Sequence, residues 1–407
     1  MRQIDLQEHQ ESKREPLTDK ERDLLSDVLP STSIEPVKGT GDYYRLRPGS
    51  IVGALEIGDM SVLIRPKIGI PQLLSIACYA LGLYKPQEQK LFDFQRAQTI
   101  PDVLALAITG SARRAFGRGL LRGYLSEEDA LYTVRGRIRF DEQIRRRYGI
   151  PLPLELRFDE FTEDILANRL VKTAVARLRH MTLGSSEARR GLSWVAATLE
   201  SVSLLEFRRR NVPEVRFDRL NEHYREVVGL ARLILLHSEF ESFRGDVRAS
   251  GFLIDMNILF QEFVVQSLRE TLGVSGNTLR SEETVPLDEE KMVHLRPDLS
   301  WWENGDCKFV GDAKYKNITD RSVPNADLYQ LLAYATALDL PGGLLIYAKG
   351  EASLGSYKVR HTDKWLEIVE VDLSKPLDTI LVRIQRIGRR IEELRDEACW
   401  LHFSKAT

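Results

Sequence analysis

The sequence predicts a mixed protein in two parts, an α+β region over residues 1–245 followed by an α/β region over residues 246–407. At 407 residues the chain is longer than a single hydrophobic core usually supports, so more than one domain is expected. In the first part, alternating polar and apolar stretches come early and helical spacing follows. In the second part, the order helix, three strands, helix, strand predicts a sheet covered by helices.

The first part begins with short elements and continues with helices. Residues 20–29 have the spacing of a short amphipathic helix, and residues 43–70 alternate with period two between glycines, which predicts a small twisted sheet or barrel. A pair of strands with arginines on one side is expected around residues 132–140. Further helices are expected at residues 71–83, 103–116, 160–180, 191–205 and 221–240.

The second part follows a connector at residues 244–246. Its helices are expected at residues 252–272 and 326–338 and from Leu377 onward. Its strands are expected at residues 284–287, 291–302, 308–315, 343–347 and 365–371.

Composition limits the class of protein. Hydrophobic residues make up 43% and charged residues 29%, and no apolar run approaches the roughly 20 residues that a membrane span needs. The N-terminus lacks the apolar segment of a secretory signal. Cys78, Cys307 and Cys399 lie far apart and have no histidine at metal-ligand spacing, which argues against disulfides and structural zinc. A cytoplasmic protein without membrane association is expected.

One stretch is strongly basic although the net charge is only −2. Residues 111–150 contain ten arginines and five acidic residues. Such an excess can neutralise phosphates, and it also fits a solvated helical face and hairpin. The sequence leaves open whether this stretch contacts DNA or protein.

Two neighbouring segments contain the candidate catalytic residues Asp298, Asp312 and Lys314. Asn304-Gly305 is a strong hairpin signal between Asp298 and Asp312, so strand pairing can bring the two carboxylates together. Strand periodicity places Asp312 and Lys314 on one face. Adjacent carboxylates repel each other unless a divalent cation holds them, and Mg²⁺ prefers such oxygen ligands together with phosphate oxygens. The lysine would then orient a bound water for in-line attack on phosphorus.

The spacing of these three residues by itself also fits a salt-bridged exposed strand. Three further features favour a site. Pro297 precedes Asp298, Glu262 interrupts an apolar helical stripe, and Gln330 and Tyr334 lie at i, i+4 on one helix face. Glu262 as plain helix surface and Tyr334 as a core residue remain the alternatives.

The order helix-Glu, Pro-Asp, Asp-x-Lys, Gln-x-x-x-Tyr resembles the RecB-like branch of the PD-(D/E)xK nucleases. The sequence also resembles the McrC family, the nuclease subunit of McrBC-type modification-dependent restriction systems. The stretches that carry this likeness are residues 4–8, 64–69, 134–138, 158–164, 168–169, 252–257, 296–298, 312–316 and 329–330.

The resemblance implies a restriction-endonuclease-like α/β domain over residues 246–407 and an α+β adaptor over residues 1–245. An McrC-like protein works with an McrB-like AAA+ GTPase hexamer, docks its N-terminal region into the central pore and stimulates nucleotide hydrolysis. This sequence agrees in lacking a G-x-x-x-x-G-K-[S/T] loop. The expected substrate is double-stranded DNA that carries a modification.

The resemblance also implies a metal site. Asp298 and Asp312 are expected to bind Mg²⁺, for which Mn²⁺ substitutes, with the Ala313 carbonyl as a further ligand. Glu262 is expected to complete or tune the metal shell.

The remaining site residues are assigned to the reaction itself. Lys314 is expected to position the water and stabilise charge on the phosphate, while Gln330 and Tyr334 orient the DNA backbone or the lysine. The products would carry 5′-phosphate and 3′-hydroxyl ends. Two alternatives are a non-catalytic activator of the AAA+ partner and a stand-alone RecB-like DNA repair nuclease.

Overall fold

The computed structural model describes residues 2–29, 32–39, 41–82, 99–148, 150–207, 211–244, 247–316, 324–348 and 355–406. These residues form two compact units. The terminal unit comprises Met1–Asp93, Glu241–Ala249 and Leu253–Thr407, and the middle unit comprises Phe94–Phe240 and Ser250–Phe252. In the described part of the chain, no helix is long and apolar enough to cross a membrane.

These units divide the chain differently from the predicted boundary near residue 245. That boundary lies between β10 (Ser238–Arg244) and β11 (Val247–Asp255), which are neighbouring strands of one sheet. β11 also neighbours β5 (Ile51–Ile57) in that sheet. Strand pairing between distant segments leaves no local mark in the sequence, which is why the pattern of elements placed the boundary elsewhere.

The first sheet of the terminal unit has the strand order β1-β6-β5-β11-β10. β1 (Arg2–Gln7) is parallel to β6 (Met60–Arg65), and β6 is antiparallel to β5. Helix α1 (Asp19–Val28) starts at a capping box between Thr18 and Glu21, and it packs against this sheet through an apolar core. A small sheet beside it contains β2 (Glu15–Pro16), β4 (Tyr43–Arg47) and β3 (Ser33–Pro36).

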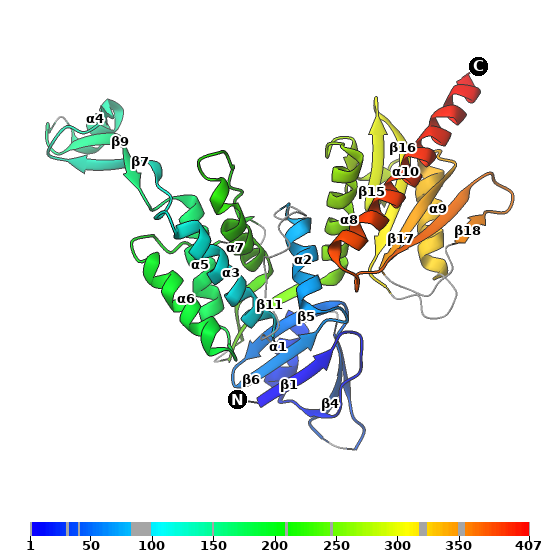
Figure 1. The fold of residues 1–407 in the computed structure, drawn as a ribbon, viewed down its shortest axis with the longest axis horizontal. Coiled ribbons are helices and arrows are strands. Elements are labelled where there is room, and N and C mark those ends of the chain that lie inside the picture. Colours follow the sequence, from blue (N-terminus) through cyan, green and yellow to red (C-terminus); the bar gives the residue numbers. More distant parts are fainter. Residues whose placement is uncertain are drawn as a thin grey trace. The chain divides into compact units, whose positions relative to one another are not determined.

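The second sheet has the strand order β12-β15-β16-β17-β19-β18 (Figure 1). Its strands are β12 (Leu279–Arg280), β15 (Leu299–Glu303), β16 (Asp306–Lys314), β17 (Gly342–Ala348), β19 (Trp365–Val371) and β18 (Gly355–Lys358). β16, β17 and β19 are parallel, and every residue of β17 is buried, as expected for a strand covered on both faces. The covering helices are α8 (Met256–Leu272), α9 (Asn325–Ala337) and α10 (Leu377–Ala406).

The hairpin between β15 and β16 forms where the sequence predicts it. Asn304 and Gly305 have φ values of 52° and 91°, the left-handed conformations that this two-residue turn requires. The predicted strand at residues 291–302 is interrupted, because β14 (His294–Leu295) pairs with β13 (Val285–Pro286) and β15 starts only at Leu299. Pro297 lies in the gap, where it cannot donate a ladder hydrogen bond.

The helix predicted at residues 252–272 starts later in the structure. Phe252 to Asp255 belong to the end of β11, and α8 begins at Met256. The Asp255 side chain accepts a hydrogen bond from the Asn257 amide at 2.9 Å and so caps the helix. Helix α2 (Ile70–Ala80), predicted at residues 71–83, packs against α8.

The middle unit contains a helical part and a small β-rich part. Its helices are α3 (Ile100–Phe116), α5 (Leu166–Arg179), α6 (Ser186–Thr198), η2 (Glu222–Tyr224) and α7 (Arg225–His237). The β-rich part, here called the β7–β9 module, contains β7 (Gly123–Leu131), β8 (Arg137–Ile138), α4 (Phe140–Arg147) and β9 (Leu154–Thr162). Figure 1 shows this module beyond the ends of the helices of its unit.

Two predictions in the middle unit are corrected by the module. The helix predicted at residues 160–180 starts only at Leu166, because the residues up to Thr162 form β9 and pair with β7. Of the strand pair predicted around residues 132–140, only β8 forms, and its partner is β9.

Candidate active site

The two predicted carboxylates meet where β15 begins. Leu299 lies opposite Gly311 in the hairpin, so Asp298 lies across from Asp312. The Asp298 amide donates to Asp312 Oδ1 at 3.3 Å, and the Ala313 amide donates to Asp298 Oδ2 at 2.9 Å. Each carboxylate is therefore held by the backbone of the other strand.

Lys314 completes this group on the same face of β16. Its ammonium forms an ion pair with Asp312 Oδ2, and the Asp312 side chain is only 1% exposed. Burial alone lowers the pKa of Lys314, but the charge and hydrogen bond of Asp312, with the charges of Asp298 and Asp327, outweigh burial and raise it. The lysine is therefore a cation at neutral pH.

The pKa of Asp298 is raised to about 7. Removal from water is the largest cause, and the charge and contact of Asp312 add to it. The Ala313 amide and the Lys314 charge act in the opposite direction. Asp298 therefore binds a proton near neutral pH, and a bound cation would relieve the same repulsion.

The donor set fits a hard divalent cation that keeps part of its water shell. Apart from the ion pair with Lys314, Asp312 Oδ2 is buried and has no hydrogen-bond partner in the described part of the chain. The described residues contain no group of three or more histidine, cysteine or acidic side chains placed to hold a metal. Two carboxylates with water and phosphate oxygens are the usual coordination of Mg²⁺ in phosphoryl-transfer sites.

Glu262 does not join Asp298 and Asp312 in one metal-binding group within the described residues. Its side chain on α8 is exposed, and its carboxyl pKa is raised by partial desolvation and by the charge of Glu282. Glu282 in turn donates its amide to the Pro297 carbonyl at 3.1 Å. Glu262 therefore lies near the segment that precedes Asp298, and its predicted part in the metal shell stays a prediction.

Gln330 and Tyr334 pair on α9, as their i, i+4 spacing predicts. Gln330 Nε2 donates to Tyr334 Oη at 2.7 Å, and Tyr334 Oη donates to the Arg296 carbonyl at 3.1 Å. Burial, followed by the charges of Asp312 and Asp298, raises the pKa of Tyr334. Tyr334 is thus both a buried residue and a neighbour of the carboxylates, while Gln330 is exposed.

Other polar residues near the carboxylates were missed by the sequence patterns. Buried Asp327 accepts a hydrogen bond from Tyr347 Oη at 2.6 Å and is within 3.0 Å of Lys316 Nζ. Tyr315 donates to Glu8 Oε2 at 3.2 Å. The alternation Asp312, Lys314, Lys316 was a usable signal for Lys316. Glu8 lies in the stretch of residues 4–8 that carries the family likeness, but nothing in that stretch indicates its contact with Tyr315.

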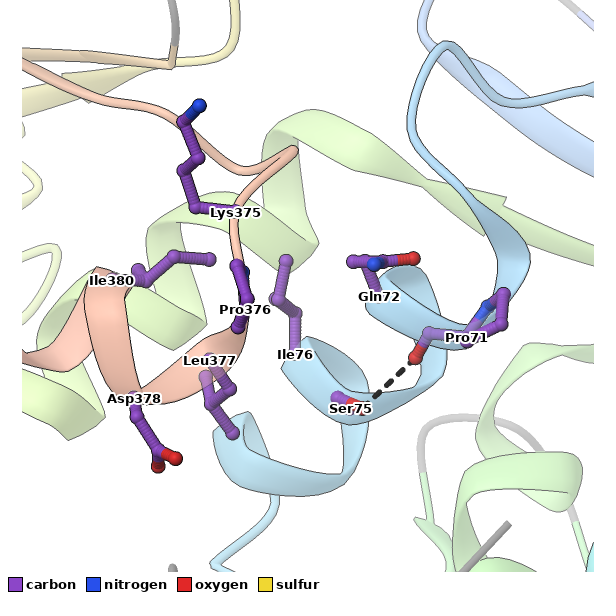
Figure 2. Close-up of a pocket in the computed structure, with 9 residues that line it drawn as sticks. All are labelled: Pro71, Gln72, Ser75, Ile76, Lys375, Pro376, Leu377, Asp378 and Ile380. Atoms are coloured by element: carbon purple, nitrogen blue, oxygen red, sulfur yellow. Dashed lines mark hydrogen bonds between the residues drawn. The ribbon is translucent and has the colours of Figure 1, made fainter. Parts of the chain in front are cut away.

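The cavity in Figure 2 lies away from this chemistry. It has a volume of about 330 Å³, and its lining comes from α2 and from the start of α10 with the residues before it. None of the predicted site residues lines it. Lys375 and Asp378 are its charged side chains, and they do not form the paired-carboxylate arrangement of the β15–β16 hairpin.

Comparison with known proteins gives a consistent result. The family described as "McrBC 5-methylcytosine restriction system component" matches residues 46–348, more than half of the chain. The chain is 24% identical over 320 residues to the type IV methyl-directed restriction enzyme EcoKMcrBC of Escherichia coli K12, covering 74% of this chain and 91% of that protein. It is also similar to a chain in a half-complex from a tetradecameric assembly of Thermococcus gammatolerans McrB AAA+ hexamers with bound McrC. That likeness has a TM-score of 0.60 at 19% identity, covers 96% of this chain and all of the other, and concerns the fold.

Proposed function

The chain belongs to the McrBC 5-methylcytosine restriction system component family, and from that premise we propose that it is a Mg²⁺-dependent DNA endonuclease subunit. The observation that supports this most directly is the group of Asp298, Asp312 and Lys314 at one end of a hairpin. Its reaction is the hydrolysis of phosphodiester bonds in double-stranded, modified DNA.

The proposed nuclease domain is of the PD-(D/E)xK type and is built on the second sheet with α8, α9 and α10. The rest of the chain is the proposed α+β adaptor. Support comes from the two adjoining strands that carry the carboxylates and the lysine, and from the helix on which Gln330 pairs with Tyr334. The first sheet shares a compact unit with this domain, so adaptor and nuclease are not proposed to fold separately.

The position of each site residue suggests its role in the proposed reaction. Asp298 and Asp312 would hold Mg²⁺ with the Ala313 carbonyl, and the bound cation supplies Lewis acidity towards the phosphate and a more acidic water. Lys314, kept charged by Asp312, stabilises the negative charge that grows on the phosphate oxygens. Tyr334 fixes the Arg296 carbonyl just before Asp298 and thereby steadies that strand entry.

The partner proposed for this chain is an McrB-like AAA+ GTPase hexamer, which the chain stimulates. The β7–β9 module supplies a suitable contact surface in place of a DNA-binding one, because most of its arginines are already paired with acids. These ion pairs include Arg135–Glu160, Arg139–Glu128, Arg145–Glu142, Arg146–Glu142, Arg147–Glu155 and Arg157–Glu128. Such pairing leaves little net charge to neutralise phosphates.

The same module exposes apolar side chains. Residues with more than half of their surface exposed are Tyr124, Tyr132, Val134, Phe140, Ile144, Tyr148, Ile150 and Phe161. The rings of Tyr124 and Phe161 are in contact, with 5.1 Å between centroids and an angle of 46° between planes, so two large rings lie together at the surface. Clustered exposed aromatic and aliphatic groups are typical of a protein-binding surface.

The deciding experiment replaces Asp312 with asparagine. Asp312→Asn removes the charge of one metal ligand and keeps its volume, so cleavage of 5-methylcytosine-containing DNA by the complex with the AAA+ partner, GTP and Mg²⁺ is expected to fall to background. The matched control is Asp306→Asn, since Asp306 is an exposed carboxylate at the other end of the same strand.

Binding to the partner and stimulation of GTP hydrolysis are measured on the same samples and are expected to remain. Cleavage by Asp312→Asn at the rate of Asp306→Asn would contradict the nuclease assignment. In that outcome, the nuclease site would lie elsewhere in the complex.

A further inference from the structure

The start of the chain touches the strand that carries the proposed active site. Tyr315 directly follows Lys314, and its hydroxyl donates to Glu8 Oε2 at 3.2 Å. Glu8 follows the last residue of β1, so 307 sequence positions separate the two partners. Both residues belong to the terminal unit.

Glu8 is held at a meeting point of three segments. Its side chain is 0% exposed, and its Oε2 also accepts a hydrogen bond from the Lys67 amide at 3.1 Å, just beyond β6. The Glu8 amide donates to the Arg65 carbonyl at 3.0 Å. One buried carboxylate thus joins the ends of β1 and β6 to the end of β16.

Burying a carboxylate in order to hold two segments together is energetically unfavourable. Withdrawal from water raises the pKa of Glu8, and the Lys67 amide, the Lys67 charge and the Tyr315 hydroxyl only oppose that effect. Apolar residues of the same volume usually stabilise such a junction at least as well. What a hydrogen-bonded carboxylate adds is a fixed direction and distance for its partner.

Tyr315 cannot act on a substrate directly from this position. Successive residues of an extended strand point to opposite faces, so Tyr315 points away from the face of Asp312 and Lys314. Its ring lies 6.3 Å from that of Phe260 on α8, and its side chain is 8% exposed. Any influence on the reaction therefore passes through the backbone that joins Tyr315 to Lys314.

We infer that Glu8 and Tyr315 are positioning residues: through their hydrogen bond, the N-terminal sheet fixes the end of β16 and thereby the reach of Lys314 toward Asp312. This inference rests on the proposed nuclease function. It makes the cleavage rate depend on the first strand of the chain, which lies on the adaptor side of the protein.

The test compares two tyrosine hydroxyls of the same kind. Tyr315→Phe removes the bond to Glu8 and keeps the ring on Phe260. Tyr79→Phe is the matched control, because the Tyr79 hydroxyl donates to Glu270 and its ring lies 5.6 Å from that of Phe263, also on α8. Each variant is assembled with the AAA+ partner, and single-turnover DNA cleavage, DNA affinity, GTP turnover and unfolding temperature are measured.

We expect Tyr315→Phe to slow single-turnover cleavage about tenfold or more with unchanged DNA affinity and GTP turnover, because a small misplacement of a catalytic group costs up to roughly a hundredfold. Tyr79→Phe is expected to cleave at the wild-type rate whatever its unfolding temperature. Glu8→Gln, which keeps an acceptor for Tyr315, is expected to retain more activity than Tyr315→Phe, and the double variant to be no slower than Tyr315→Phe.

Equal cleavage rates for Tyr315→Phe and the wild type would overturn the inference, as would equal slowing in Tyr315→Phe and Tyr79→Phe. If Tyr315→Phe does not fold, Glu8→Leu, which removes the acceptor for the Tyr315 hydroxyl, takes its place in the comparison with Tyr79→Phe. Cleavage by Asp312→Asn is the separate sign that the proposed function itself has failed. A normal rate in Tyr315→Phe together with an inactive Asp312→Asn rejects only the positioning role.

Discussion

Carboxylates occur in two contrasting settings in this protein. At the β15–β16 hairpin, Asp298 lies beside a second carboxylate, and burial followed by the charge of Asp312 raises its pKa to about 7. In the β7–β9 module, Glu128 and Glu142 accept hydrogen bonds from arginines, and these bonds lower their pKa values. One setting concentrates like charge in a buried place, while the other cancels charge at the surface.

The contrast supports different proposed roles for the two regions, catalysis at the β15–β16 hairpin and protein binding at the β7–β9 module. Crowded buried carboxylates are unfavourable until a proton or a cation joins them, so the protein keeps an arrangement that only a ligand completes. Arginine–glutamate pairs at a surface are complete by themselves and contribute little stability each. The hairpin therefore suits metal-dependent catalysis, and the module suits docking through its apolar side chains.

The largest effect is expected when the positive charge of Lys314 is removed from the hairpin site. Lys314→Ala is expected to slow single-turnover DNA cleavage by about 10²–10³-fold and to leave DNA affinity nearly unchanged, since its charge matters most in the transition state. The matched control is Lys358→Ala, an exposed lysine on β18 of the same sheet. A normal single-turnover rate with weakened DNA binding would show that Lys314 is only a phosphate contact.

A smaller effect is expected when the module loses an apolar contact. Ile144→Ser on α4 is expected to weaken binding to the AAA+ partner by roughly tenfold, because a buried aliphatic group at an interface contributes a few kcal/mol at most. Ile144 is 68% exposed in the chain by itself, so its loss should not affect folding. Val382→Ser changes a 48% exposed aliphatic residue on α10 and serves as the control. Equal partner affinity for both variants would remove the module from the proposed interface.

The sequence predicted the hairpin that brings Asp298 and Asp312 together better than it predicted the elements around that hairpin. The Asn304-Gly305 turn and the alternation of Asp312 with Lys314 depend on neighbours in the chain, and the structure has the hairpin and the pairing with Asp298 that they imply. The family resemblance is confirmed as well. Local patterns thus sufficed for this hairpin, although they failed for the strand pair predicted around residues 132–140.

Long-range pairing was beyond the reach of such patterns. The Glu8–Tyr315 contact and the place of β11 beside β5 arise only when distant segments fold together. The helix predicted to start at Phe252 starts at Met256, because the preceding residues are drawn into that sheet. The part of Glu262 in the metal shell stays a prediction, because the position of Glu262 relative to Asp298 depends on how α8 packs.

The raised pKa of Asp298 predicts a pH-dependent stability in protein without divalent cations. A carboxyl with a higher pKa in the folded state takes up a proton on folding. The free energy of unfolding therefore falls as the pH rises from the ordinary aspartate pKa to the raised pKa of about 7, and it stays lower at higher pH. Asp298→Asn removes this loss. The variant is expected to unfold about 2 °C above the wild type at pH 8 and by a smaller margin at pH 5, which lies above the ordinary aspartate pKa, so that part of the loss is already present there.

This difference is measured by thermal unfolding in the presence of EDTA, with Asp306→Asn as the control that should follow the wild type at both pH values. Added Mg²⁺ should raise the unfolding temperature of the wild type at pH 8 more than that of Asp298→Asn. Parallel unfolding temperatures for Asp298→Asn and the wild type across this pH range would mean that the pKa of Asp298 is not raised in the folded protein.

The smallest effect on stability and cleavage is expected from mutating glutamates that are already paired with arginines at the surface. Glu142 lies within 2.8 Å of both Arg145 and Arg146, and the Arg145 hydrogen bond chiefly lowers its pKa. A lowered carboxyl pKa gives a contribution to stability that is present above the ordinary glutamate range and lost as pH falls through the lowered value. Because exposed pairs are screened, Glu142→Gln should leave the neutral-pH unfolding temperature and DNA cleavage unchanged, as should Glu128→Gln. A large loss of partner binding in either variant would show that the arginine network shapes the docking surface, and the contrast with the hairpin would then be one of two functional sites.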